Sequence, residues 1–216
     1  LAKMSASLQE MSMGRLILGY GAGWYEEEYR SYGFDYPSPG VRVDMFEEGV
    51  KIIKQMWVDS PANFTGKYYR IENVYCEPRP SPRPILMLGG GGEKKTLKVV
   101  AQHADWWNDV MRPIPDLAQK LKILRQHCEA VGRDYNDIRK TLAPRFYIDK
   151  DHKKALRMAE GKNGTGQVIC GDPASVCDQL HELVEMGFDM VVTTFPQFQE
   201  LNDMKLFVDK VIPQFS

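Results

Sequence analysis

Short apolar segments alternate with longer segments of helical periodicity along most of the chain. Five of the apolar segments have the length of strands, and those that are apolar throughout are typical of strands buried on both faces of a sheet. They are residues 16–18, 85–88, 104–110, 142–148 and 190–195. Strands that alternate with helices predict an α/β fold with a parallel sheet.

Three helices are predicted from apolar residues spaced three or four positions apart, which line one face of a helix. The first ends at Gly132 and has the stripe Leu117, Leu121, Leu124, Cys128 and Val131. The second runs from Asp172, a capping residue, to Gly187, and its stripe is Val176, Leu180, Leu183 and Val184. The third covers residues 41–57. Each has one apolar side to pack against a sheet.

The segment 24–84 is much longer than the roughly 30 residues of a simple strand-to-helix unit. Within it, residues 63–69 have the pattern of a small hairpin that turns at Thr65 and Gly66. The proline-rich segment 77–84 is expected to run extended, because proline fixes φ and disfavours helix in the residue before it. We predict that it leads stiffly into the strand at 85–88.

The most informative segment joins this strand to a helix through four consecutive glycines. They are Gly89, Gly90, Gly91 and Gly92. Glycines let backbone N–H groups approach a ligand closely, and the free N–H groups of a helix N-terminus favour an anion. We predict that this segment binds a phosphate, with help from the Thr96 hydroxyl and from the charge of Lys94 or Lys95. The alternative is a tight turn, which needs only one or two glycines.

A second cluster of small residues follows the strand at 16–18. It consists of Gly21, Ala22 and Gly23 and is followed by Trp24. The dinucleotide-binding pattern G-x-G-x-x-G requires glycine where Trp24 stands, and its fold requires a strand where residues 41–57 are predicted helical. We therefore reject that interpretation and predict a strand end that opens onto a cavity for a flat ligand, with Trp24 as a wall. The alternative for Trp24 is a core residue beside a turn.

The remaining polar residues form no recognisable catalytic group. Glu26, Glu27 and Glu28 are expected to begin a solvated helix, where the helix dipole favours acids. The four histidines and four cysteines lack the spacing of metal ligands, so we predict no metal site and expect the cysteines to be small buried side chains. The motifs of common hydrolases and NTPases are absent. Catalytic residues are therefore not identified.

Composition narrows the function classes further. The chain has 216 residues, and its 28 Lys and Arg against 29 Asp and Glu leave a net charge of -1. This balance argues against a nucleic-acid partner bound by phosphate neutralisation. No apolar run approaches the ~20 residues of a membrane-spanning helix, and the first residues lack the features of a signal peptide. We expect a cytoplasmic protein, not in a membrane, that acts on a small molecule.

One ordered set of motifs covers almost the whole chain. It comprises residues 12–24, Glu28, Arg42, Glu47 and Glu48, then 64–69, the proline-rich segment, 89–97, 101–108, 168–173 and 187–189. In this order they resemble the luciferase-like monooxygenase superfamily, and most of all its coenzyme F420-dependent oxidoreductase branch. Each motif alone is weakly specific, whereas the ordered set is specific.

The resemblance implies a (β/α)8 barrel of the TIM type, with the cofactor at the C-terminal ends of the strands. It implies that residues 1–216 are a single partial barrel domain covering strands 4 to 8, with an insertion between strands 4 and 5. By resemblance, Gly89 to Gly92 with Thr96 hold the cofactor phosphate, and Gly21 to Trp24 lie along the cofactor. The implied chemistry is hydride transfer between a deazaflavin and an organic substrate, and the alternative is an FMN-dependent monooxygenase.

Two departures from the family pattern affect these expectations. Some F420-dependent dehydrogenases carry an active-site glutamate where Trp24 stands, so a sugar-phosphate dehydrogenase of that kind is not expected. The first three βα units of the family barrel are missing from this chain. We expect the open strand edges to pair with a second copy or a completing chain, or the chain to be a truncated, non-catalytic binding or assembly subunit.

Overall fold

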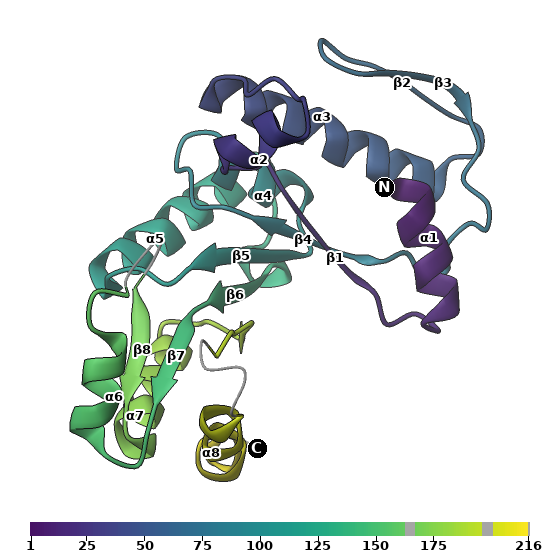
Figure 1. Cartoon of the computed structure of the whole chain (residues 1–216). Coiled ribbons are helices and arrows are strands. Elements are labelled where there is room, and N and C mark those ends of the chain that lie inside the picture. Colours follow the sequence, from purple (N-terminus) through teal and green to yellow (C-terminus); the bar gives the residue numbers. More distant parts are fainter. Residues whose placement is uncertain (163–166, 196–200, 216) are drawn as a thin grey trace. The chain divides into compact units, whose positions relative to one another are not determined.

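The computed structural model describes residues 1–162, 167–195 and 201–215 (Figure 1). The chain divides into two compact units. Unit 1 comprises Leu1–Trp107 and Leu124–Ile138, and unit 2 comprises Asn108–Ile123 and Arg139–Ser216. Strand β5 (Trp106–Val110) and helix α5 (Ile114–Val131) contribute residues to both units.

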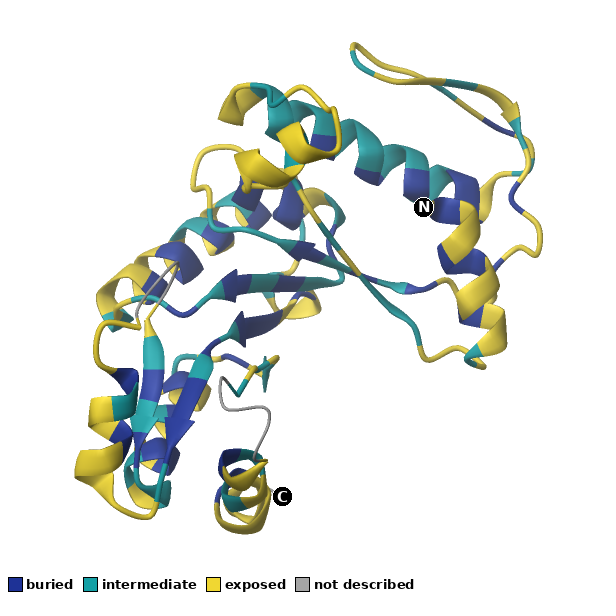
Figure 2. Ribbon diagram, viewed as in Figure 1, coloured by how far each residue is buried: buried dark blue, intermediate teal, exposed yellow. Residues whose placement is uncertain are grey.

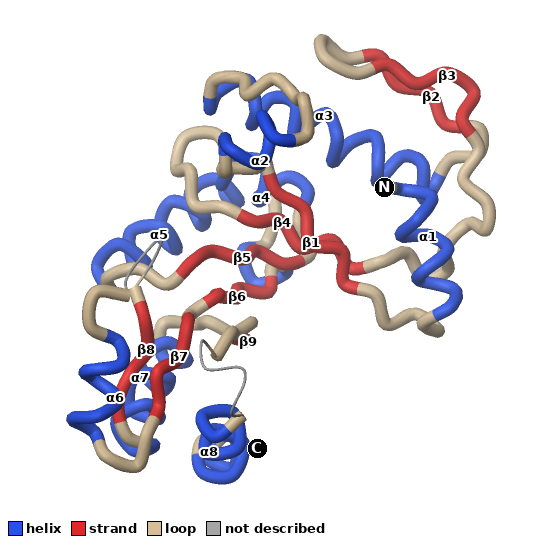
Figure 3. Tube along the Cα trace, viewed as in Figure 1, coloured by secondary structure: helices blue, strands red, loops and turns tan. Residues whose placement is uncertain are grey.

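Unit 1 alternates helices and strands, and its longest helix buries one face while most of its other residues are of intermediate exposure (Figure 2). Its elements are α1 (Ala2–Met11), β1 (Ile17–Gly21), α2 (Glu26–Ser31), α3 (Pro39–Val58), β2 (Ala62–Thr65), β3 (Arg70–Val74), β4 (Ile85–Gly89), α4 (Thr96–His103) and a 3-10 helix, η1 (Tyr135–Asp137). The strand order is β1-β4-β5 (Figure 3). Strands β1 and β4 are parallel, and their register pairs Ile17 with Ile85 and Gly21 with Gly89.

Unit 2 is also built from parallel strands and helices. Its elements are β6 (Arg139–Ala143), β7 (Arg145–Ile148), α6 (His152–Ala159), β8 (Val168–Gly171), α7 (Pro173–Glu185), β9 (Met190–Val191), α8 (Asn202–Lys210) and a second 3-10 helix, η2 (Ile212–Gln214). The strand order here is β5-β6-β9, and β7 pairs with β8 in a separate two-stranded sheet. Both β6-β9 and β7-β8 are parallel, which confirms the predicted α/β fold.

The predicted helix ends are confirmed by their capping geometry. Helix α5 stops at Val131, and Gly132 follows with φ +68°, a left-handed conformation that glycine adopts at little cost. Helix α7 begins after Asp172, whose side chain accepts the Ser175 backbone N–H. Gly187 ends it with φ +94°. Local sequence therefore determines where these two helices start and stop.

One position in the predicted stripe of α7 was wrong. Val176, Leu180 and Leu183 are buried as expected, whereas Val184 is 54% exposed. A helix advances about 100° per residue, so the residue next to Leu183 points well away from it. The predicted helix 41–57 lies within α3, and its buried residues are Phe46, Val50, Ile53, Met56 and Trp57.

The strand predictions differ from the structure in three places. The single strand expected over 142–148 is divided at Pro144 into β6 and β7, because proline has no N–H to give to a sheet. The strand expected over 190–195 is limited to β9, with an isolated bridge between Arg145 and Thr194. Strand β8 was missed, since four residues carry little periodicity and its place is set by pairing with β7.

The predicted hairpin is present, but its turn lies further along the chain. Strands β2 and β3 pair antiparallel with Thr65 opposite Arg70. The turn spans 66–69 and is closed by the Gly66 N–H, which donates to the Tyr69 carbonyl at 2.8 Å. The proline-rich segment runs without helix or strand into β4, as expected. It is fastened to α1 by Gln9, which donates to the Pro82 carbonyl.

Each unit has its own buried core. In unit 1 it includes Phe46, Trp57, Leu86, Leu88 and Leu97. In unit 2 it includes Leu142, Phe146, Ile148, Ile169 and Leu183. In the described part of the chain, no helix combines the length and the apolar character needed to cross a membrane.

Candidate functional site

The two glycine clusters singled out in the sequence lie next to each other in unit 1. Gly21 is the last residue of β1 and Gly89 is the last residue of β4, and the register of these parallel strands pairs them directly. The carboxyl ends of parallel strands share one edge of a sheet, which is where barrel enzymes place their sites. The fold therefore brings the two expected binding segments to the same edge.

The four-glycine loop is packed around Thr96, the first residue of α4. Thr96 is buried, and a Cβ at Gly92 would lie only 2.7 Å from its hydroxyl oxygen. Gly90 has φ +122°, and its carbonyl accepts the indole N–H of Trp107 at 2.9 Å. Glycine is thus required at 90 by the positive φ, and at 92 because a side chain there would meet Thr96.

Gly21 and Gly89 have no such internal explanation. A Cβ at Gly21 would come no closer than 3.6 Å to other atoms of the chain, and one at Gly89 no closer than 3.9 Å. Neither residue has a positive φ. The missing side chains leave space at the edge of the sheet that the protein does not itself fill, which fits the close approach of a ligand.

The lysines expected to add charge near the loop differ in their surroundings. Lys95 Nζ lies 2.6 Å from the Asp44 carboxylate of α3, so its charge is already paired. Lys94 is exposed. The Glu93 carbonyl contacts the ring Nε2 of His127 at 2.8 Å. Of the two lysines, Lys94 is the one whose charge fits the predicted phosphate.

A pocket of about 480 Å³ opens beside the end of β1. Gly21 and Ala22 contribute to its floor, and two charged residues, Asp35 and Arg42, also line it. The aromatic lining residues are Tyr20, Tyr29, Phe34, Phe46 and Tyr69. The strand end thus opens onto a cavity, as the small residues predict, and aromatic residues make up five of the eleven that line it.

Trp24 is not among the residues that line this pocket. Its side chain is 69% exposed, and its ring lies 5.4 Å from that of Tyr25, measured between centroids. Its carbonyl accepts the Tyr36 hydroxyl at 2.8 Å. Gly23, with φ +74°, leaves the room that the Tyr29 hydroxyl occupies. The backbone at 23–24 therefore supports the pocket, while the exposed Trp24 side chain does not line it.

Two tyrosines of the pocket are held in their protonated state. Burial raises the pKa of Tyr20, and burial likewise raises the pKa of Tyr69. Tyr20 packs on Phe46 at 5.3 Å between ring centroids, and Gly49 of α3 leaves the space for its hydroxyl. Both hydroxyls therefore remain hydrogen-bond donors at neutral pH.

Glu48 fastens the hairpin turn to α3. Its carboxylate accepts three backbone N–H groups, from Lys67 at 2.7 Å and from Tyr68 and Tyr69 at 2.9 Å each. Desolvation raises the pKa of Glu48, but these donors, Tyr68 first, lower it more, so the net shift is downward. Gly66 is required here because a side chain would meet the carboxylate. In the sequence Glu48 stands only within a motif, and no local pattern points to this role.

The other candidate groups do not join the site. Glu26, Glu27 and Glu28 are exposed in the first turn of α2, as expected. All four cysteines are free thiols; Cys76, Cys128 and Cys177 are buried as expected, whereas Cys170 is only partly buried. Among the residues that the structure describes, no group of His, Cys, Asp or Glu has the arrangement of a metal site.

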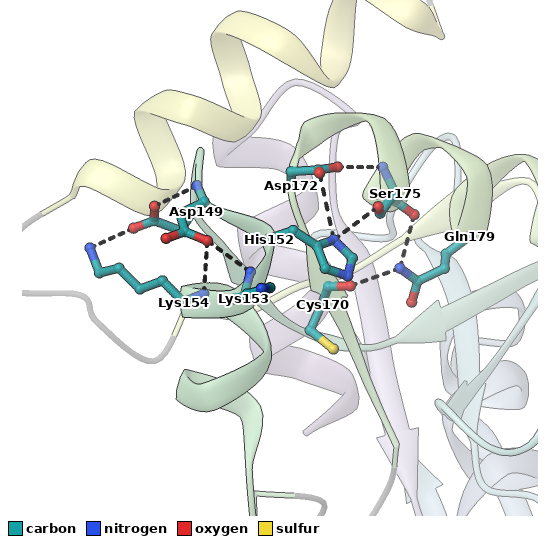
Figure 4. Close-up of polar contacts among 9 residues, drawn as sticks. Asp149, His152, Lys153, Lys154, Cys170, Asp172, Ser175 and Gln179 are labelled. Carbon is teal, nitrogen blue, oxygen red and sulfur yellow. Dashed lines mark hydrogen bonds and ion pairs between the residues drawn. The ribbon is translucent and has the colours of Figure 1, made fainter.

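A polar cluster in unit 2 combines histidine, serine and aspartate (Figure 4). Nδ1 of His152 lies 3.1 Å from the Ser175 hydroxyl and 3.5 Å from the Asp172 carboxylate. Both contacts fall on the same ring nitrogen, whereas a Ser-His-Asp catalytic triad uses both nitrogens of the ring. Asp172 also caps α7. The cluster therefore stabilises a helix start and does not activate a nucleophile.

Comparisons with known proteins agree with this geometry. A family model described as luciferase-like monooxygenase matches residues 1–164. An uncharacterized protein of Mycobacterium bovis is 25% identical over 212 residues, covering 98% of this chain and 63% of the relative. The chain thus spans less than two thirds of that relative's length.

Two further relatives have named activities. An F420-dependent glucose-6-phosphate dehydrogenase of Amycolatopsis mediterranei is 23% identical, over 99% of this chain and 74% of the relative. An FMNH(2)-dependent dimethylsulfone monooxygenase of Pseudomonas fluorescens is 19% identical, over 98% of this chain and 68% of the relative. Both expected cofactors thus occur among the relatives.

A solved structure shows the same fold. It is an F420-dependent secondary alcohol dehydrogenase in complex with an F420-acetone adduct, 20% identical, with a TM-score of 0.85 over 98% of this chain and 73% of that one. The likeness confirms the predicted TIM-barrel type of fold. In the described residues the barrel is incomplete, since β1 and β9 stand at the ends of the strand order.

Proposed function

The chain belongs to the luciferase-like monooxygenase family, whose model matches residues 1–164, and we propose that it is an oxidoreductase that exchanges hydride between coenzyme F420 and a small organic substrate. The observation that carries the proposal is the pairing of Gly21 with Gly89 at the carboxyl ends of β1 and β4. Neither glycine is demanded by packing within the chain. The free space lies beside the aromatic pocket, in reach of a flat ring.

The residues at this edge fit the cofactor in two parts. Gly21 has no side chain and Ala22 only a methyl group, so together they leave room along which a ring system lies. The loop from Gly89 to Gly92, with Thr96 at the start of α4, offers backbone N–H groups and a helix N-terminus to a phosphate. When bound, a deazaflavin supplies a two-electron hydride carrier.

The chain's own residues orient the substrate and exclude water. Rings of Tyr20, Phe46 and Tyr69 wall the pocket, and the protonated hydroxyls of the two tyrosines donate hydrogen bonds to a substrate oxygen. Arg42 and Asp35 bring one charge of each sign to the same pocket. Glu48 keeps Tyr69 in place through the Tyr69 backbone N–H.

FMN is the second candidate cofactor. The FMNH(2)-dependent relative supports it, because it matches 98% of this chain. The F420-dependent relative and the F420-bound solved structure support the first candidate over 99% and 98% of the chain. A glucose-6-phosphate activity is not proposed, because Trp24 stands where some F420-dependent dehydrogenases carry an active-site glutamate.

Cofactor titration tests the proposal directly. The purified chain is titrated with F420 and, separately, with FMN, and binding is followed by the fluorescence of each ring. We expect a dissociation constant on the order of micromolar for F420 and weaker binding of FMN. The reverse order supports the monooxygenase alternative, and no micromolar binding of either overturns the proposal for this chain.

A matched pair of variants locates the site. Gly21→Ala adds a methyl group at the strand end, where it meets no atom of the chain closer than 3.6 Å. Gly19→Ala adds the same group two residues earlier on β1, at 3.5 Å from Met87. We expect Gly21→Ala to weaken F420 binding at least about tenfold, or ~1.4 kcal/mol, and Gly19→Ala to leave it nearly unchanged. An equal effect of both would show that the cofactor binds elsewhere.

A further inference from the structure

Arg42 lines the aromatic pocket of unit 1, and among the residues that the structure describes it forms no salt bridge. Two other arginines show the usual arrangement. Arg30 binds Glu26 through Nε and Nη2 at 3.0 and 2.6 Å, and Arg112 binds Asp109 through the same two atoms at 2.9 and 3.1 Å. In the described part of the chain, neither Nε of Arg42, which is buried, nor its Nη2 has a hydrogen-bond partner.

The Arg42 guanidinium is held in place by uncharged groups. Its central carbon lies 4.0 Å from the centre of the Tyr36 ring, and Nη1 donates to the Pro37 carbonyl at 2.5 Å. Tyr36 is fixed in turn, because its hydroxyl donates to the Trp24 carbonyl at 2.8 Å and its ring packs edge-on against Tyr29. None of these contacts neutralises the charge. The positive charge is thus positioned before any ligand binds.

Two further hydrogen-bond donors line the same pocket. The hydroxyls of Tyr20 and Tyr69 form no hydrogen bond with any residue that the structure describes. Asp35 is the charged acceptor among the lining residues, and no ion pair joins it to Arg42 within the described ranges. The pocket therefore offers more donors than its own acceptors use. Its unpaired groups match a ligand group that carries negative charge and accepts several hydrogen bonds.

We propose that the pocket binds a small organic monocarboxylate, with the carboxylate at Arg42 and the apolar body against the aromatic residues. This assignment rests on the proposed function, because it names the substrate class of that oxidoreductase. The carboxylate anchors the molecule and takes no part in the hydride exchange.

Charge and geometry select a carboxylate over a phosphate. A carboxylate accepts hydrogen bonds at two oxygens and pairs well with a planar guanidinium. A phosphate monoester carries about two negative charges at neutral pH. The pocket holds one cation, Arg42, and one anion, Asp35, so a second negative charge on the ligand would have no partner.

The other lining residues determine the rest of the molecule. Phe34, Met45 and Phe46 are apolar and surround the charged groups with hydrocarbon. The volume of about 480 Å³ lies within the range of roughly 300–1,000 Å³ that is usual for small-molecule sites. Benzoate is a suitable probe, because it combines one carboxylate with a flat apolar ring. Benzamide has nearly the same shape and no charge.

An NMR titration of the isotope-labelled whole chain, without F420, tests the carboxylate site. We expect benzoate to shift the amide signals of Ala22, Phe34 and Tyr69 with a dissociation constant on the order of 1 mM. Benzamide should bind at least about tenfold more weakly, and phenyl phosphate should bind no more tightly than benzoate. Equal binding of benzoate and benzamide, tighter binding of phenyl phosphate, or no shift at these residues up to about 20 mM benzoate overturns the proposal.

Arg42→Gln removes the anchoring charge and should weaken benzoate binding at least about tenfold while changing benzamide binding little. Arg30→Gln is the matched control, because it removes the same charge from a paired arginine outside the pocket, and it should leave benzoate binding unchanged. Arg42→Gln also removes contacts with Tyr36 and Pro37. Asp35→Asn therefore supplies a second test that a folding defect cannot imitate, since loss of the opposing charge should strengthen benzoate binding about two- to threefold. Equal losses in the two arginine variants, or weaker binding in Asp35→Asn, overturn the proposal.

F420 binding is measured separately, so that the two proposals fail in different ways. A chain that binds F420 but not benzoate overturns the carboxylate substrate and leaves the proposed function standing. A chain that binds benzoate at Arg42 but not F420 overturns the proposed function, and with it the assignment of the acid as a substrate. Binding of both supports both proposals.

Discussion

Glu48 Oε2 accepts the backbone N–H of Tyr69 at 2.9 Å, and this bond ties the pocket wall to helix α3. Tyr69 is the last residue of a hairpin turn, a kind of segment that is usually mobile. The same carboxylate also binds the N–H groups of Lys67 and Tyr68, so one side chain holds three backbone groups of the turn. Glu48 thus holds part of the long segment 24–84 beside the end of β1, where Tyr69 lines the pocket.

Glu48→Gln is predicted to loosen this turn without unfolding α3. The amide has one acceptor oxygen where the carboxylate has two, so at least one of the three backbone donors loses its partner. We expect hydrogen exchange at Lys67, Tyr68 and Tyr69 to become several-fold faster, and cofactor or substrate binding in the pocket to weaken. Glu47→Gln is the matched control, because Glu47 pairs with Lys51 on the same helix. Equal exchange rates in both variants would contradict the role given to Glu48.

Part of the geometry of the candidate site was predictable from the sequence. Gly21 and Gly89 were recognised separately from the chemistry of glycine, and their register in parallel strands puts them side by side. The two clusters meet because each stands at the carboxyl end of a strand, and the carboxyl ends of neighbouring parallel strands share an edge. Their binding role stays a prediction, as does the single partial domain expected for residues 1–216.

The rest of the pocket was not predictable because its residues meet only in three dimensions. Phe46 is a core residue of helix α3, and Tyr69 belongs to a hairpin that comes after that helix in the chain. Neither has a local pattern that points to the end of β1. Helix α1 was missed for a related reason. Its buried residues are small or polar. This is the reverse of the pattern by which an amphipathic helix is recognised, in which large apolar residues face the core.

Asp105 is predicted to be a stabilising residue at the other end of β4. Its carboxylate binds the Arg83 guanidinium through both oxygens, one of these bonds being 2.7 Å, and accepts the Leu86 N–H at 2.8 Å. Burial raises the pKa of Asp105, but the hydrogen bonds from Arg83 and Leu86 lower it by more, so the net shift is downward. We expect Asp105→Asn to cost about 1–3 kcal/mol in urea unfolding at neutral pH.

The exposed pair of Arg70 and Glu72 provides the control for this prediction, because Glu72→Gln should cost less than about 0.5 kcal/mol. The contribution of Asp105 has a defined pH dependence. Since its folded pKa is depressed, the stability is present above the unfolded pKa and is lost as the pH falls through the folded value. A cost for Asp105→Asn that persists unchanged into strong acid would contradict this account.

Gly92 and Thr96 are predicted to be coupled. A Cβ at Gly92 would lie 2.7 Å from Oγ1 and 3.3 Å from Cβ of Thr96, so Gly92→Ala must displace the buried threonine. We expect a cost of about 1–3 kcal/mol, as for other overpacking substitutions. In the Thr96→Ala background the crowding oxygen is gone, and Gly92→Ala should cost clearly less. A double-mutant cycle measures the coupling, and strictly additive costs would show that the two side chains do not compete for space.

His103, at the end of α4, is predicted to make unit 1 sensitive to mild acid. Burial, followed by the charge of Lys54, lowers its pKa from 6.5 to about 4, although Glu47 opposes the effect of Lys54, Lys51 and Arg133. The unfolded chain takes up a proton near pH 6.5 while the folded chain stays neutral. Stability from this source is therefore complete above about pH 6.5 and is lost as the pH falls toward 4.

All four tryptophans lie in unit 1, so their fluorescence reports its urea unfolding. Relative to His103→Gln, the wild type should lose about 1 kcal/mol across this window after solvent screening. The control His181→Gln, in unit 2, should follow the wild type, and parallel curves for His103→Gln and wild type would refute the prediction.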